Sequence, residues 1–159
     1  MRMHAALTRG LVLPLVLLGL LATAPLAHAI IGAHAGAICK AYNHSDVPFI
    51  DSYTDGIRSS KGSPTNVTCP LTRNTSSSLG AIIYVAIKHV GTQTTQCSAY
   101  SYGFDGSLLA SDFKTLTGSG YGTLTFNLST SNAYSSYSVL CSIPGDDASV
   151  LHEVVVDEK

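Results

Sequence analysis

Apolar and polar residues alternate one by one along most of the chain beyond residue 30, and an alternation of period two indicates β-strands with one buried face. Residues 81–90 show it clearly, with Ala81, Ile83, Val85 and Ile87 on one side of the predicted strand. No stretch of ten or more residues beyond residue 29 places its apolar side chains at the 3.6-residue spacing of a helix. The sequence therefore predicts an all-β domain.

Eight or nine strands are predicted, mostly from this alternation; one at residues 37–42 is short, and the ninth, at residues 56–60, is the optional one. They cover residues 37–42, 56–60, 67–73, 81–90, 97–102, 107–116, 121–128, 137–143 and 149–156. Turn-forming runs separate them at residues 91–93, residues 118–120 and, most strongly, residues 144–147. Residues 43–64 mostly lack alternation, and we expect an extended loop there. Eight or nine short strands with turns about every ten residues predict an antiparallel β-sandwich, Ig-like or jelly-roll-like, with a barrel as the alternative.

Residues 1–29 have the pattern of a signal peptide. Arg2 and Arg9 accompany an apolar block at residues 11–21, and Ala27 and Ala29 provide the small residues of a cleavage site. The apolar block is too short for a membrane span, which requires about 20 residues. We therefore expect residues 30–159 to form a single domain that is secreted or periplasmic, with no membrane span in the mature chain.

Composition changes the picture of the surface. The chain is 45% hydrophobic and only 12% charged, and much of the apolar excess lies in the predicted signal peptide. Without Arg2 and Arg9, seven basic residues stand against ten acidic ones, which gives a net charge of −3. A mildly acidic domain without a basic patch is not expected to bind nucleic acid. The abundant Ser and Thr residues suit strand positions that face solvent without carrying charge.

Four cysteines, Cys39, Cys69, Cys97 and Cys141, all follow the predicted cleavage site. An even number of cysteines in an exported chain predicts two disulfides. Their wide spacing does not fit a zinc site, which favours pairs at short spacing. Three pairings are possible, and we expect the sequential one, Cys39 with Cys69 and Cys97 with Cys141.

Candidate catalytic and metal-binding residues do not form a complete set. Ser119 belongs to no GxSxG elbow and lies between predicted strands. His152 precedes a glutamate, but no second histidine follows one helical turn later, and its parity places it on the face of Val150 and Val154. The acidic turns lack the spacing of a calcium loop. We therefore expect no catalytic residue, no metal and no cofactor.

Tyrosines are the strongest binding feature of the sequence. All eight tyrosines follow the predicted signal peptide, and the chain has no tryptophan. Tyr100 and Tyr102 share a strand face opposite Cys97, and Tyr134 and Tyr137 flank a pair of serines. An exposed row of these four tyrosines would stack on sugars or anchor a protein partner. Ordinary strand propensity is the alternative explanation, and the absence of tryptophan weakens the sugar version.

One motif resembles a known family. The run from Val67 to Arg73, the long strand that ends at His89, and the region of Tyr137 to Pro144 are similar to a family of small secreted bacterial proteins of unknown function. The resemblance covers about residues 39–158 and includes the four cysteines. It implies bacterial export and a disulfide-bearing β fold, and it provides no activity, cofactor or catalytic residue.

The leading hypothesis is a non-enzymatic binding or surface-associated structural module, with a cell-surface protein or a glycan as its partner. The alternative is a small secreted hydrolase or a hydrolase inhibitor. A hydrolase needs His89 or His152 beside a carboxylate and a serine in a deep pocket. An inhibitor needs a rigid exposed loop, for which residues 43–64 are the candidate.

Overall fold

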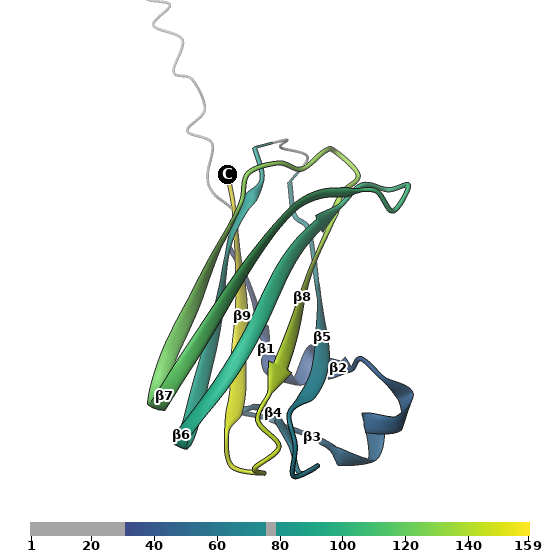
Figure 1. The fold of residues 1–159 in the computed structure, drawn as a ribbon. Coiled ribbons are helices and arrows are strands. Elements are labelled where there is room, and N and C mark those ends of the chain that lie inside the picture. Colours follow the sequence, from purple (N-terminus) through teal and green to yellow (C-terminus); the bar gives the residue numbers. More distant parts are fainter. Residues whose placement is uncertain (1–30, 76–78) are drawn as a thin grey trace, which may run out of the picture.

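A computed structural model describes residues 31–75 and 79–159, and the predicted signal peptide at residues 1–29 lies outside this part of the chain. Two short 3-10 helices and nine strands make up the described residues (Figure 1). The elements are β1 Ile31–Ala35, η1 Gly36–Ile38, β2 Lys40–Ala41, η2 His44–Phe49, β3 Ile50–Tyr53, β4 Gly56–Ser59, β5 Thr65–Leu71, β6 Ala81–Tyr102, β7 Leu108–Leu128, β8 Ser136–Ile143 and β9 Val150–Glu158. Neither helix in this part is long enough to cross a membrane.

The strands form two antiparallel layers, as the alternation predicted. Sheet I contains β2, β5, β8, the second half of β6 and the first half of β7. Sheet II contains β3, β4, β1, β9, the first half of β6 and the second half of β7. The prediction of an all-β antiparallel sandwich is confirmed.

Strands β6 and β7 belong to both layers, and this differs from the predicted turns. Each is a single strand of more than 20 residues, 22 in β6 and 21 in β7, and the two pair along almost their whole length. Their pairing is interrupted only between His89 and Gln93 and near Tyr102, so residues 91–93 and 118–120 bend the ribbon rather than ending its strands. The hairpins predicted there are wrong. Gly91 and Gly118, both at positive φ, allow the ribbon to turn from one sheet to the other.

The segment at residues 43–64 also differs from the expected loop. It contains η2, β3 and β4, and the last two pair as a hairpin at one edge of sheet II. The number of strands still agrees with the prediction for the described residues, because two pairs of predicted strands merge while β1 and β3 are added.

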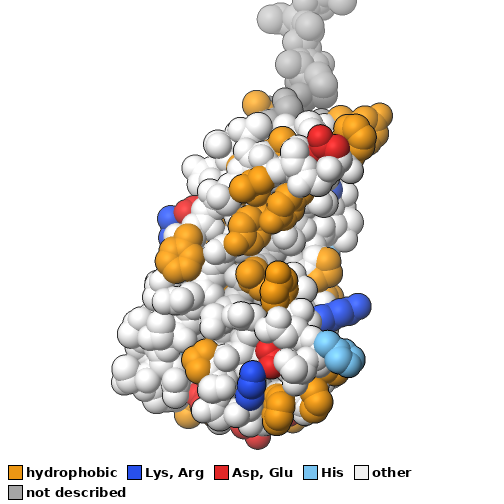
Figure 2. All heavy atoms as spheres, turned by 45° about the vertical axis from the view of Figure 1, so that its right-hand side comes forward, with side chains coloured by type: hydrophobic (Ala, Val, Ile, Leu, Met, Phe, Trp, Pro, Cys, Tyr) orange, Lys and Arg blue, Asp and Glu red, His pale blue; other side chains and the backbone are white. Residues whose placement is uncertain are grey.

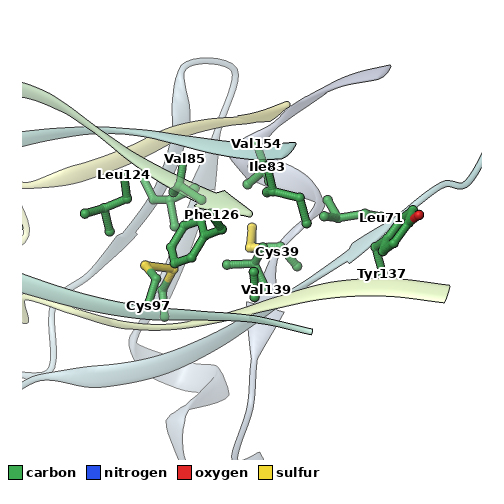
Figure 3. Close-up of a cluster of buried hydrophobic side chains, with 14 of the residues drawn as sticks. Cys39, Leu71, Ile83, Val85, Cys97, Leu124, Phe126, Tyr137, Val139 and Val154 are labelled. Carbon is green, nitrogen blue, oxygen red and sulfur yellow. A yellow bond between two sulfur atoms is a disulfide. The ribbon is translucent and has the colours of Figure 1, made fainter. Parts of the chain in front are cut away.

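The core lies between the sheets and is built from the predicted inward faces. Phe126 of β7, which is fully buried, lies between Ile83 and Val85 of sheet II and the disulfide of Cys97 (Figure 3). Tyr137 and Leu71 pack at one end of this layer (Figure 3). The alternation thus identified the buried side of each long strand.

Both disulfides have the expected sequential pairing. Cys39 bonds to Cys69, and Cys97 bonds to Cys141. Cys97 and Cys141 are direct cross-strand partners of β6 and β8, with Cα atoms 4.1 Å apart. All four cysteines are buried in the core. Two buried disulfides are typical of proteins that work in an oxidising compartment.

Candidate functional site

The outer face of sheet I is the candidate site. It consists of the outward side chains of β5, β8, the second half of β6 and the first half of β7, and we call it the neutral face. On each strand the outward residues alternate with buried ones, and they pair with outward residues of the neighbouring strands. They are Asn66, Thr68, Pro70, Ser136, Ser138, Leu140, Ser142, Gln96, Ser98, Tyr100, Tyr102, Leu108, Ser111, Phe113 and Thr115.

None of these side chains is charged. Lys40, on the two-residue edge strand β2, is the one charged residue at the paired outward positions of sheet I. The outer face of sheet II differs, because Lys88, Glu153 and Asp157 lie at its outward positions. The two faces of the sandwich therefore have different chemistry, and only the face of sheet I lacks charge over four strands.

Tyr100 and Tyr102 lie on the neutral face near the end of β6. Their rings stack with centroids 5.7 Å apart, and both are half-buried. Cross-strand pairing puts Leu140 and Phe113 on either side of Ser98, so each is a diagonal neighbour of Tyr100. Phe113 is 56% exposed. Figure 2 shows hydrophobic side chains as a band across this side of the molecule, surrounded mainly by uncharged surface.

A second aromatic pair extends the band beyond the ends of the strands. Phe104, in the turn between β6 and β7, makes an edge contact with Tyr134, with centroids 6.3 Å apart. Both rings are almost fully exposed. Asp105 holds this turn by accepting hydrogen bonds from the hydroxyl and the backbone N–H of Ser107, at 2.7 and 3.0 Å. These two hydrogen bonds lower the pKa of Asp105.

Several polar side chains of the neutral face make no hydrogen bond to another described residue. Among the described residues, the hydroxyl and amide groups of Gln96, Ser98, Tyr100, Tyr102 and Ser111 have no hydrogen-bond partner. Buried polar groups elsewhere in this part of the chain are mostly bonded, for example the Ser59 hydroxyl to that of Thr65 at 2.7 Å. The face thus presents unpaired donors and acceptors beside exposed aromatic rings.

The four predicted tyrosines do not form one row. Tyr100, Tyr102 and Tyr134 lie along the band, but Tyr137 is 2% exposed and faces the core between the sheets (Figure 3). The placement of Tyr137 in an exposed row is wrong, because it shares the inward parity of Val139 and Cys141. Sequence reasoning also missed Phe113, Leu140 and Pro70. Outward alternation with Ser111 and Thr115 was the signal that could have found Phe113.

The histidines weighed as catalytic candidates make other contacts. His89 is buried, and its Nδ1 and Nε2 atoms lie 3.1 Å from the carbonyl oxygen of Gly118 and 2.8 Å from the hydroxyl of Thr95. His152 bonds through Nδ1 to the carbonyl oxygen of Asp55, at 2.6 Å, and stacks on Tyr121. The predicted parity of His152 is wrong, since the pairing of β9 shifts there and Leu151 takes the inward position.

Residues 43–64, the segment expected to carry an inhibitory loop, are mostly exposed but are anchored to the fold at a few buried positions. Asp46 of η2 is 3% exposed and forms an ion pair with Lys61 at 2.6 Å. The hydrogen bonds from Lys61 and Asn43 lower the pKa of Asp46. Across residues 31–75 and 79–159, no group of three or more His, Cys, Asp or Glu side chains is close enough to hold a metal ion.

Comparison with solved structures identifies the architecture. The xylan-binding module CBM15 matches 82% of this chain and 97% of its own, with a TM-score of 0.53 and 12% identity. The CBM36-1 domain of a multidomain xylanase from the hindgut metagenome of Trinervitermes trinervoides matches 82% and 98%, with a TM-score of 0.51 and 7% identity. The chain shares the fold of these two modules. No protein-family model and no curated protein matches its sequence.

Proposed function

We propose that this protein is an exported, non-enzymatic module that binds an uncharged carbohydrate chain on its neutral face. The observation that carries the proposal is the combination of exposed aromatic rings with unpaired hydroxyl and amide groups on a surface without charge. The resemblance to small secreted bacterial proteins adds bacterial export to the proposal, into the periplasm or the medium.

The aromatic band suits the shape of a sugar. A pyranose ring has a face of C–H groups and a rim of hydroxyls, so it stacks on aromatic side chains while its rim bonds to polar groups nearby. Tyr100 and Phe113 provide ring surface. Ser98 lies beside both, because it pairs with Phe113 across the strands and shares a face of β6 with Tyr100. Tyrosine is suited to such contacts because its ring is apolar and its hydroxyl is polar.

The lack of charge on the neutral face favours an uncharged carbohydrate over an anionic one. An anionic chain is bound by arginine or lysine through charge-assisted hydrogen bonds, and the neutral face has only Lys40 at its edge. Covering a neutral surface with a neutral ligand desolvates no charged group, which removes a large cost of binding. The likeness in fold to a xylan-binding module and to a domain of a xylanase supports a carbohydrate partner.

A binding assay with matched tyrosine variants tests this proposal. The mature protein is titrated with soluble neutral polysaccharides, a xylan, a mannan and a mixed-linkage glucan, by isothermal calorimetry. Tyr100→Ala is expected to weaken binding by about tenfold or more, the effect of losing a central aromatic contact. Tyr84→Ala is the control, because Tyr84 is also half-buried on β6 but faces outward from sheet II.

Two results would contradict the proposal. One is that the wild-type protein binds none of the neutral polysaccharides while retaining its melting temperature. The other is that sedimentation shows a stable dimer that Tyr100→Ala dissociates, since a second copy of the chain would then be the occupant of the face.

A further inference from the structure

The neutral face ends in a hollow of about 340 Å³. Three turns of the chain line it: the connection between β4 and β5, the bend of β6, and the connection between β8 and β9. Its lining residues are Gly62, Ser63, Pro64, Thr92, Gln93, Thr94, Pro144, Gly145 and Asp146. We call it the end hollow. The aromatic band lies toward the opposite end of the same sheet.

Resting on the proposed function, we propose that the end hollow is a second contact zone of the same site. The ligand is then a linear, uncharged polysaccharide that runs along β6 and β8, from the aromatic band into the end hollow. Short oligosaccharides occupy only the band.

The walls of the end hollow continue the strands of the neutral face. Pro64 precedes the outward residue Asn66 by two positions, and Pro144 follows Ser142 by two. Thr94 precedes Gln96 by two positions on β6. Because outward positions recur every second residue, the outward rows of β5 and β6 lead through the exposed residues Pro64 and Thr94 into the end hollow, and the buried Pro144 closes its wall at the end of β8.

The end hollow offers hydrogen bonds without free charge. The amide of Gln93 lines it and has no hydrogen-bond partner within the described residues. Its one carboxylate, that of Asp146, is occupied by its own turn. Oδ1 accepts the backbone N–H groups of Ala148 and Ser149, and Oδ2 accepts the Ser149 hydroxyl at 2.6 Å. An uncharged, hydroxyl-rich ligand is therefore suited to the end hollow for the same reason that it is suited to the neutral face.

Contacts between the turns fix the shape of the end hollow. The backbone N–H of Gly62 donates to the carbonyl oxygen of Gly145 at 2.9 Å, and the N–H of Asp147 donates to that of Ser59 at 2.9 Å. Gly145 lies so close to Ser63 that a Cβ atom on it would be 2.2 Å from the Ser63 carbonyl oxygen. These contacts hold the turns together, so binding does not have to order them first.

The length of the site sets the length of the ligand. Thr94 and Tyr102 lie eight residues apart on β6, which corresponds to about 26 Å at about 3.3 Å per residue of strand. A mono- or disaccharide cannot contact both ends, and a chain of several sugars can. Affinity is therefore expected to rise with chain length until the ligand reaches the end hollow.

A length series of neutral oligosaccharides tests this inference. The wild-type protein, Gln93→Ala and Tyr100→Ala are titrated with oligomers of two to eight sugars of the polysaccharide that binds best. Gln93→Ala is expected to weaken binding of the longest oligomers by about three- to tenfold, the effect of one or two lost hydrogen bonds, and to leave short oligomers unchanged. Tyr100→Ala is expected to weaken every length. Thr125→Ala, on the outer face of sheet II, is the control.

Chemical shifts give a second measurement that does not depend on a variant. The side-chain amide signals of Gln93 are expected to shift with long oligomers and not with short ones, whereas signals of Tyr100 shift with both. If affinity does not depend on length, or if Gln93→Ala has no effect at any length, the second contact zone is refuted while the proposed function stands. If the wild-type protein binds no oligomer, both are refuted.

Discussion

The Nε2 atom of His89 lies 2.8 Å from the Oγ1 atom of Thr95, six residues further along the same strand. The two residues stand on either side of the bend at which β6 passes from sheet II to sheet I. The other ring nitrogen of His89 bonds to the carbonyl oxygen of Gly118, at the bend of β7. His89 therefore links the bends of both strands at the point where the half of β6 that carries Tyr100 leaves sheet II.

Replacement of Thr95 by valine tests this role. Thr95 is fully buried, so Thr95→Val keeps the shape of the side chain but leaves Nε2 of His89 without a partner. We expect a loss of about 1 to 3 kcal/mol in the free energy of unfolding, measured in urea. Thr94→Val is the control, because the Thr94 hydroxyl bonds to that of Thr117 at an exposed position. Equal effects of the two variants would show that the contact with His89 is not important.

Removal of each disulfide is expected to be strongly destabilising. The bridges close loops with sequence separations of 30 and 44 residues, and the chain-entropy model assigns such loops about 3 to 4 kcal/mol each. The paired variants Cys39→Ala with Cys69→Ala, and Cys97→Ala with Cys141→Ala, are compared with the wild-type protein by denaturant unfolding. Reduction of the wild-type protein by a thiol should reproduce the loss. A variant pair as stable as the wild-type protein would contradict the prediction.

Acid is expected to weaken the turn between β8 and β9. Burial acts to raise the pKa of Asp146, but hydrogen bonds from Ser149 and Ala148 outweigh it and the pKa is lowered. A carboxyl group with a lowered folded pKa stabilises the fold above its unfolded pKa of about 3.9, and this contribution is lost as the pH falls through the folded pKa. Asp146→Ala should therefore lower stability at neutral pH by about 1 to 2 kcal/mol and make the decline in acid shallower.

The neighbouring carboxylate provides the control for this measurement. Asp147 is exposed and has a φ of 56°, a conformation that asparagine also tolerates. Asp147→Asn is expected to leave the stability at neutral pH unchanged. If Asp146→Ala and the wild-type protein decline in parallel between about pH 5 and pH 2, then Asp146 is not a source of acid sensitivity.

Gly145 is expected to tolerate no side chain. Its missing Cβ allows the turn after β8 to lie against the backbone of Ser63. Gly145→Ala should destabilise the protein by about 1 to 3 kcal/mol, the usual cost of inserting an atom into a packed contact, and thermal unfolding measures it. Gly32→Ala is the control, since the atom nearest to its Cβ would be the side-chain nitrogen of Asn74, at 3.1 Å, which can move aside. A Gly145→Ala variant with an unchanged melting temperature would show that the turns have room to separate.

Several features could be predicted because they depend on local pattern. The inward positions of β6, such as Ile83 and Val85, follow from alternation alone, since neighbouring side chains of a strand point to opposite faces. Tyr100 and Tyr102 lie two residues apart on one strand, so alternation places them on the same face, where their rings stack. The predictions failed where the pattern was interrupted. Gly91 and Gly118 were interpreted as turns, and the shift in β9 reversed the face of His152.

By itself, the sequence determined an all-β sandwich with two buried disulfides. The alternation of apolar and polar residues can be read within each strand, and the number and order of the cysteines can be read along the chain. Only the tertiary structure decided that β6 and β7 cross from one sheet to the other, and that Phe113, Leu140 and Tyr100 meet on one uncharged face. The physical reason is that neighbouring strands in a sheet are paired by residues far apart in the chain, and local alternation does not encode which strands pair. The composition is rich in Ser and Thr and poor in charge, but only the strand pairing shows that uncharged residues gather on one face of the fold.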